Sequence, residues 1–151
     1  MQLEKQTYVK NWNHKTDKHQ VTIKLNNKIR KDINPSRISA IIEDVMYWRK
    51  ANHIHSWFVS NVQDGVDDCG RYFVSIEKLK ELAAQCDEVL KFDPSISPSE
   101  LLPTQEGFFF GGTKYDEYYY DQCKETSKVI KSLLKEDHNE YGGDYYYSSS
   151  W

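Results

Sequence analysis

The residues from Tyr47 to Phe58 place polar side chains that are costly to bury among large apolar ones. The run contains one Arg, one Asn and two His, and its apolar residues recur with the spacing of a helix. A buried polar group must find a hydrogen-bond partner or lose free energy, so a helix that only fills a core rarely uses these residues. The segment therefore predicts either a polar site or an unusually elaborate core.

We expect this segment to belong to one long helix from Pro35 to about Val62. Asn34 suits the N-cap, and proline is favoured at the first helical position. Two neighbouring arcs of the helical wheel carry the apolar and polar core residues, and together they wrap more than half of the helix, so its second half should be central and buried. The first arc holds Ile41, Val45, Trp48, Asn52, His55 and Val59.

Two further helices and a few short strands complete the expected fold. Ser75 should cap a helix with a stripe at Leu79, Leu82, Cys86 and Val89, and residues 97–100 form a capping box before a short helical turn. Thr113 should cap the last helix. Strands are expected at 7–9, 21–25, 72–74 and 108–110. The fold class is therefore α+β, with about three main helices and a small antiparallel sheet made of an N-terminal hairpin, a short central strand and a C-terminal strand.

The C-terminal residues 142–151 form an aromatic tail that begins at two glycines. A tail with three consecutive tyrosines and a final Trp151 is too apolar to stay solvated. It should dock as a strand, either on its own domain or on another chain, and in the second case it would make a homo-oligomer.

The length and charge of the chain limit its class. A chain of 151 residues suits a single domain that spans 1–151. Residues 1–31 form a basic hairpin region with a balance of 8 − 2 = +6, whereas the remainder has 12 − 21 = −9. The net charge of −3 argues against a general nucleic-acid binder. The basic region suits a phosphate or an acidic partner, or it is a solvated hairpin that blunts an edge strand.

The cysteines and the first residues favour the cytoplasm. The three cysteines have no CxxC spacing, the start of the chain has no apolar signal region, and no stretch approaches the ~20 apolar residues of a membrane span. We therefore expect free thiols, no membrane and no zinc, and the absence of dinucleotide or P-loop motifs predicts no cofactor.

The first candidate site is the polar set on the expected central helix. Arg49 offers a planar fork for phosphate, Asn52 can bind an amide or a base edge, and Trp48 is a stacking surface. With His55, which lies three residues after Asn52, this set suits a nucleotide-like ligand. The alternative is that Asn52 and His55 satisfy backbone groups of the glycine-containing loop at 63–70.

Two more candidate sites follow along the chain. Asp67 and Asp68 suit acid–base work with His55 as the base, although loop caps and Asx turns are the more common explanation of such carboxylates. A ligand rim is the third candidate, because glycines flank an aromatic strand before a helix N-terminus, where free N–H groups favour an anion. Thr113 and Asp116 can also satisfy those groups themselves. The rim residues are Thr104, Phe110, Thr113, Tyr115 and Asp116.

Residues 36–151 resemble a family of small uncharacterised proteins of tailed bacteriophages and prophages. Four blocks carry the resemblance, and Gly112 stands where the family pattern has Ser. The blocks are Tyr47-Trp48-Arg49-Lys50-Ala51-Asn52-x-Ile54-His55-x-Trp57-Phe58, Gln63-x-Gly65-x-Asp67-Asp68-Cys69, Leu101-Leu102-Pro103-Thr104-x-x-Gly107-Phe108-Phe109-Phe110-Gly111-x-Thr113-x-Tyr115-Asp116-Glu117 and Ser149-Ser150-Trp151.

The resemblance implies an accessory protein in the bacterial host cytoplasm. It leaves three hypotheses for the function. The first is a binding protein that counteracts a host defence by sequestering a nucleotide-like ligand or by occupying a host defence protein. The second is a small hydrolase or transferase acting on a phosphorylated or nucleotide substrate. In the third, the polar set only ties loops to a core, and the protein is an oligomeric interaction protein. The binding hypothesis is preferred because the polar set lacks an activated nucleophile.

Overall fold

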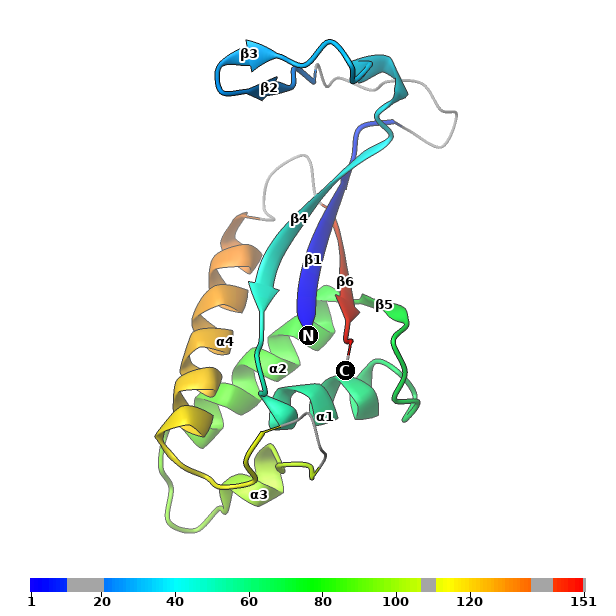
Figure 1. Ribbon diagram of the computed structural model, residues 1–151. Helices are drawn as coiled ribbons and strands as arrows, with labels where there is room; N and C mark the ends of the chain where they lie inside the picture. Colours follow the sequence, from blue (N-terminus) through cyan, green and yellow to red (C-terminus); the bar gives the residue numbers. More distant parts are fainter. Residues whose placement is uncertain (11–20, 107–110, 137–142, 151) are drawn as a thin grey trace.

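A four-stranded antiparallel sheet forms one layer of the molecule in the computed structural model, which describes residues 1–10, 21–106, 111–136 and 143–150. The strand order is β4 (Ala40–Tyr47), β1 (Gln2–Tyr8), β6 (Asp144–Ser148) and β5 (Arg71–Val74). Both neighbours of β1 are antiparallel to it, with Gln2 opposite Tyr47 on one side and Ser148 on the other. The N-terminal and C-terminal strands therefore lie at the centre of the sheet (Figure 1).

The helices pack on one side of this sheet (Figure 1). They are α1 (Asn52–Asn61), α2 (Ile76–Val89), the single turn α3 (Pro98–Leu101) and α4 (Glu117–Glu136). Alternation along β6 buries Tyr145 and Tyr147 against the helices, where they join Leu3, Phe58 and Leu82 in one core. The predicted α+β class, with three main helices and a small antiparallel sheet, is confirmed.

The predicted helix from Pro35 to Val62 is wrong over most of its length. Residues 35–37 make only a short 3-10 helix, residues 40–47 are β4, and the helix α1 begins at Asn52. The β-branched residues Ile41, Ile42 and Val45 favour a strand, and β4 pairs with β1 along its whole length. Lys50 then has a positive φ of 59°, which separates the strand from the helix.

The expected N-terminal hairpin is also replaced. The first strand does not pair with residues 21–25; β1 pairs with β4 and β6 instead. Only β2 (Lys24–Leu25) remains of the second strand, and it pairs with β3 (Lys28–Ile29) in a separate hairpin. Asn26 and Asn27 form its turn with φ values of 49° and 62°, the left-handed conformation that asparagine tolerates. This hairpin lies beyond the far ends of β1 and β4 (Figure 1).

The remaining elements follow the predictions more closely. Ser75 caps α2, and the capping box at Ser97 starts α3. The last helix is capped by Asp116, whose Oδ1 accepts a hydrogen bond from the Tyr119 backbone at 3.3 Å, and not by Thr113. The aromatic tail docks on its own domain as β6, with both edges paired. The expected strand at 108–110 lies outside the described residues.

Candidate functional site

Asn52, the first residue of α1, joins two loops that are distant in the sequence. The side chain is buried, its Nδ2 donates to the Gly112 carbonyl at 2.8 Å, and its Oδ1 accepts from the Gln105 backbone N–H at 3.2 Å. Asn52 therefore forms hydrogen bonds with loop backbone groups, as one of the two alternatives expected, but these groups belong to Gln105 and Gly112 and not to the loop at 63–70. Asn52 thereby holds the segment before α4 against the start of α1.

The predicted rim residues meet in the same place. Thr104 donates through Oγ1 to the Thr113 carbonyl at 3.1 Å, and its backbone N–H donates to the Tyr115 hydroxyl at 3.3 Å. Gly111 has a φ of 85°, and a Cβ on it would lie 2.9 Å from the Lys50 Cβ. The chain can approach Lys50 this closely only because residue 111 is a glycine.

These contacts enclose a small recess between α1 and the N-terminus of α4. Its volume is about 40 Å³, which suits a few waters or one small group rather than a whole nucleotide. His53 lines the recess, is only 3% exposed, and its Nε2 has no hydrogen-bond partner among the described residues. A buried polar atom without a partner is uncommon in native proteins. The recess is lined by Lys50, Asn52, His53, Thr104, Gly112, Lys114, Asp116, Tyr118 and Tyr119.

The charges around the recess favour an anion. Lys50 and Lys114 contribute two positive charges to its lining, against one carboxylate from Asp116. The 20-residue helix α4 begins directly beside it, and its dipole adds positive potential at that end. Tyr118 fixes one wall by donating its hydroxyl to the Arg49 carbonyl. The arrangement can therefore hold a negatively charged group of phosphate size.

Two buried thiols lie behind this recess. The His53 and Tyr119 rings are tilted by 45° with their centroids 4.3 Å apart, and both residues neighbour Cys123. A hydrogen bond from Cys86 and, against the effect of burial, the neighbouring His53 lower the pKa of Cys123 to about 6. The same pairing, together with burial, raises the pKa of Cys86. Of the two thiols, Cys123 is therefore the one that ionises first, and both are free in this structure.

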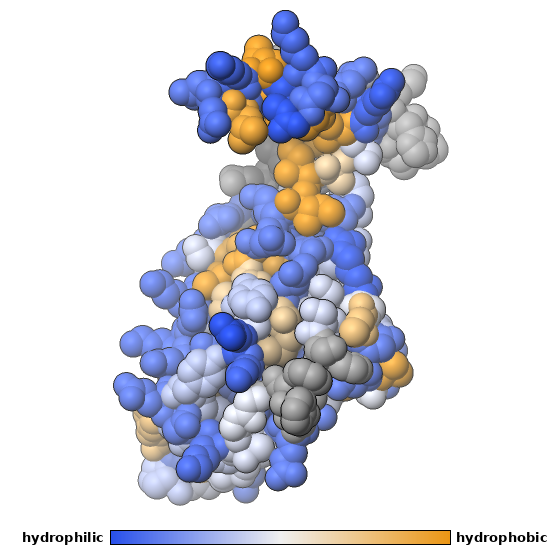
Figure 2. All heavy atoms as spheres, in the orientation of Figure 1, coloured by the Kyte–Doolittle hydropathy of each residue, from blue (hydrophilic) through white to orange (hydrophobic). Residues whose placement is uncertain are grey.

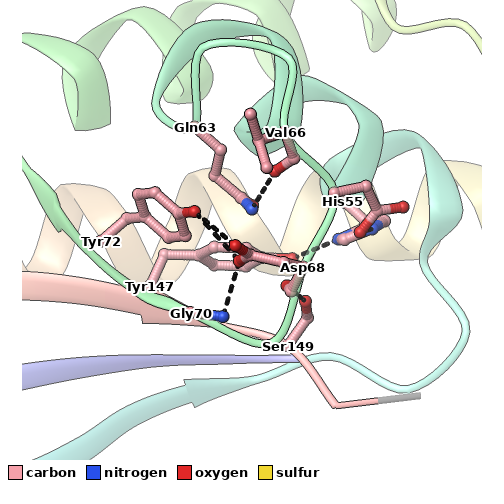
Figure 3. Close-up of polar contacts among 9 residues, drawn as sticks. His55, Gln63, Val66, Asp68, Gly70, Tyr72, Tyr147 and Ser149 are labelled. Carbon is pink, nitrogen blue, oxygen red and sulfur yellow. Dashed lines mark hydrogen bonds and ion pairs between the residues drawn. The ribbon is translucent and has the colours of Figure 1, made fainter.

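His55 belongs to a second polar cluster, on the side of α1 that faces the sheet (Figure 3). Its Nδ1 lies 2.6 Å from the Tyr147 hydroxyl and its Nε2 lies 3.1 Å from Asp67 Oδ1. His55 and Tyr147 are completely buried, and burial raises the pKa of Tyr147. Both ring nitrogens of His55 thus face partners within the protein, which orients the ring and suits a structural link between α1 and β6.

Asp68 organises the loop beside this cluster (Figure 3). Its Oδ1 accepts from the Gly70 backbone at 2.7 Å and from the Tyr72 hydroxyl at 3.0 Å. The Asp68 carbonyl in turn accepts from Ser149 Oγ at 3.3 Å. Asp68 therefore acts as an Asx-type loop cap that also anchors the end of β6. Within the described parts of the chain, no group of three or more His, Cys, Asp or Glu is placed to hold a metal ion.

The structure divides the predicted site residues between two places. Asn52, Thr104, Thr113, Tyr115 and Asp116 gather around the recess, whereas His55, Asp67 and Asp68 belong to the second cluster. Phe110 lies outside the described residues.

Trp48 and Arg49 do not form the expected binding face. Trp48 is completely buried and donates through Nε1 to Thr126 Oγ1 at 2.8 Å, so its ring is not available to stack on a ligand. Arg49 is exposed and meets the recess only through its carbonyl.

Sequence reasoning missed several recess residues. Lys50 and Lys114 directly follow residues that were predicted, so their neighbourhood was a usable signal. His53 had the same signal, since it directly follows Asn52, but a lone histidine on a helix is usually a satisfied core residue. The missed residues are Lys50, His53, Lys114, Tyr118 and Tyr119.

Comparison of the chain with protein-family models, with curated proteins and with solved structures gives no match. No helix in the described residues is both long enough and apolar enough to cross a membrane.

Proposed function

We propose that this protein binds a ligand with a phosphate or similar anionic group in the recess between α1 and α4. The observation that carries the proposal is the buried His53, which lines the recess and whose Nε2 has no hydrogen-bond partner among the described residues. A bound oxyanion would accept a hydrogen bond from this nitrogen. Lys50 and Lys114 would balance its charge, as would the N-terminus of α4.

The size of the recess sets how such a ligand would bind. A volume of about 40 Å³ admits the anionic group alone. The rest of a nucleotide-like molecule would therefore lie outside the recess, and the affinity would come mainly from the anionic group. Together with the resemblance to bacteriophage proteins, this supports an accessory protein that counteracts a host defence by sequestering a nucleotide-like ligand.

Isothermal titration with inorganic phosphate, ADP and adenosine tests the binding. We expect phosphate and ADP to bind and adenosine not to bind. Lys114→Ala should weaken the binding of ADP about tenfold, the effect of one charge-assisted contact. Lys50→Ala should act in the same direction, because Lys50 belongs to the same lining.

Lys128→Ala is the matched control, since Lys128 is an exposed lysine on the same helix but does not line the recess. Its binding of ADP should equal that of the unsubstituted protein. Equal weakening in the control, or no binding of phosphate and ADP at all, would contradict the proposal. Native mass spectrometry of the protein purified from bacterial cells would identify a ligand that it carries there.

The enzyme hypothesis has less support from the geometry. It assigned the role of base to His55 and an assisting role to Asp67 or Asp68. His55 is completely buried and its two ring nitrogens face Tyr147 and Asp67, so a substrate would reach it only after this cluster opens.

A further inference from the structure

Phe92 is exposed in an unusual backbone conformation. It is 64% exposed, and its φ of 53° is one that bulky residues rarely adopt. Its ring rests on Tyr120 at a centroid distance of 4.9 Å, which holds it in place on the turn between α2 and α3. We call residues 88–93 the Phe92 turn. Strained backbone positions cluster at functional sites, and exposed aromatic side chains are enriched at protein interfaces.

The opposite end of the molecule carries an apolar hollow. It has a volume of about 530 Å³ and lies between residues 21–24 and the start of β4. We call residues 21–39 the arm, which contains β2 and β3. Figure 2 shows apolar residues on the arm and where the arm meets the sheet. The hollow is lined by Val21, Thr22, Ile23, Lys24, Ile38, Ala40 and Ile41.

The two features carry opposite charge. The arm has five Lys or Arg and one Asp, a balance of 5 − 1 = +4. Residues 87–100, which include the Phe92 turn, have four acidic residues and one Lys, a balance of 1 − 4 = −3. Lys24 lies in the lining of the hollow, and Asp93 directly follows Phe92. An aromatic knob with acidic neighbours thus matches an apolar hollow with basic neighbours.

One chain cannot bring these features together, because they lie at opposite ends of the molecule (Figure 1). We propose that the protein forms a homodimer in which the Phe92 turn of each copy inserts into the hollow beside the arm of the other. Two copies that lie antiparallel make this contact twice, as a two-fold axis requires. The C-terminal strand takes no part, since both of its edges are paired within the chain.

Sedimentation velocity on the full chain tests the dimer. At low salt we expect a monomer–dimer equilibrium between about 1 and 200 micromolar, the range for a small transient interface. Phe92→Gly should remain a monomer over this range, and Ile41→Lys, which changes the hollow, should do the same. Raising the salt concentration should weaken the dimer at least threefold, because the charges at the rim are exposed.

Glycine is chosen at position 92 so that loss of the dimer contact can be distinguished from loss of folding. A positive φ suits glycine, so Phe92→Gly should keep the melting temperature of the unsubstituted monomer when both are measured below the concentration range of the dimer. Phe73→Ala is the matched control, since Phe73 is similarly exposed but lies on β5, away from the Phe92 turn; it should dimerise normally.

A chain that stays monomeric at the highest concentration would overturn the proposal, as would a Phe92→Gly variant that dimerises like the unsubstituted protein. A monomer that instead co-sediments with DNA or with anionic phosphatidylserine vesicles would also overturn it, and would assign the arm to a polyanionic surface.

Discussion

His55 joins two parts of the chain that are 92 residues apart. Replacing it with alanine removes the ring, so the buried Tyr147 hydroxyl and the Asp67 carboxylate both lose this hydrogen-bond partner. We expect His55→Ala to destabilise the protein by about 3 kcal/mol, from a lost buried hydrogen bond and a new cavity. Urea denaturation followed by tryptophan fluorescence measures this change.

Tyr147→Phe is the comparison, because it removes only the hydroxyl and keeps the ring stacked on Phe58 at 3.9 Å. We expect it to cost about 1.5 kcal/mol. The double variant should lose less than the sum of the single variants, since both remove the same hydrogen bond. Strict additivity would show that the two groups do not interact.

Asn52 should be sensitive to substitution for a different reason. Asn52→Ala leaves the Gly112 carbonyl and the Gln105 N–H without their partner, which costs about 2 kcal/mol. Because these bonds shape the recess, we also expect weaker binding of phosphate. Thermal unfolding and titration on the same variant separate the two effects: unchanged melting with normal binding would contradict the role of Asn52 in joining the loops.

The residue types of this region predicted that buried hydrogen bonds would form, but the sequence did not indicate which residues would be the partners. Asn, His and Trp near a core predict hydrogen bonds, and Asn52, His55 and Trp48 each make at least one. The partners lie 60, 92 and 78 residues away, respectively, so spacing along one helix could not show them. The shared helical face expected for Trp48 and Asn52 depended on a helix that begins at Pro35.

One carboxylate links α2 to α4 by polar contacts. Asp87 accepts from Ser127 Oγ at 2.6 Å and pairs with Lys131 Nζ at 2.5 Å. Partial burial acts to raise the pKa of Asp87, but these two partners hold it below its ordinary value of 3.8. A lowered folded pKa stabilises the protein above pH 3.8, and this stabilisation is lost as the pH falls through the folded pKa.

Asp87→Asn should therefore destabilise the protein at neutral pH by at most about 1 kcal/mol, because the pair is partly exposed and screened. The difference between the variant and the original protein should close on acidification below pH 3.8, because only the original loses stability there. Thermal unfolding between neutral and acidic pH measures it. Asp93→Asn is the control: Asp93 also has a lowered pKa but sits on an exposed turn, so a change as large as that of Asp87→Asn would refute the role of the helix contact.

Elements with local signals were predicted well, and elements defined by pairing were not. Ser75 and the stripe from Leu79 to Val89 specify α2 by themselves. Residues 40–47 instead match a helical arc by spacing, yet they pair with β1 over its full length. The β-branched pair at Ile41 and Ile42 was the local sign of a strand, but only the sheet partner decides between the two structures.

The order of the strands makes the whole domain depend on the last residues of the chain. β6 lies between β1 and β5, and it buries Tyr145 and Tyr147 against the helices. The aromatic tail predicted that these residues dock, since their apolar area is too large to stay in water. It did not predict an inner position, because strand order is a property of the assembled sheet.

A chain that ends at Gly143 should consequently fail to fold. Without β6, β5 loses its partner, one edge of β1 is unpaired, and two buried aromatic rings leave the core. The loss of two such rings alone amounts to more than about 6 kcal/mol, as much as the whole stability of a typical small domain.

We expect no cooperative thermal transition in the truncated chain. Addition of a synthetic peptide of residues 144–151 should restore the transition in a concentration-dependent way, because the missing strand can pair with both neighbours. A truncated chain that unfolds cooperatively at the original midpoint would show that the core does not need β6. That result would contradict the placement of β6 between β1 and β5.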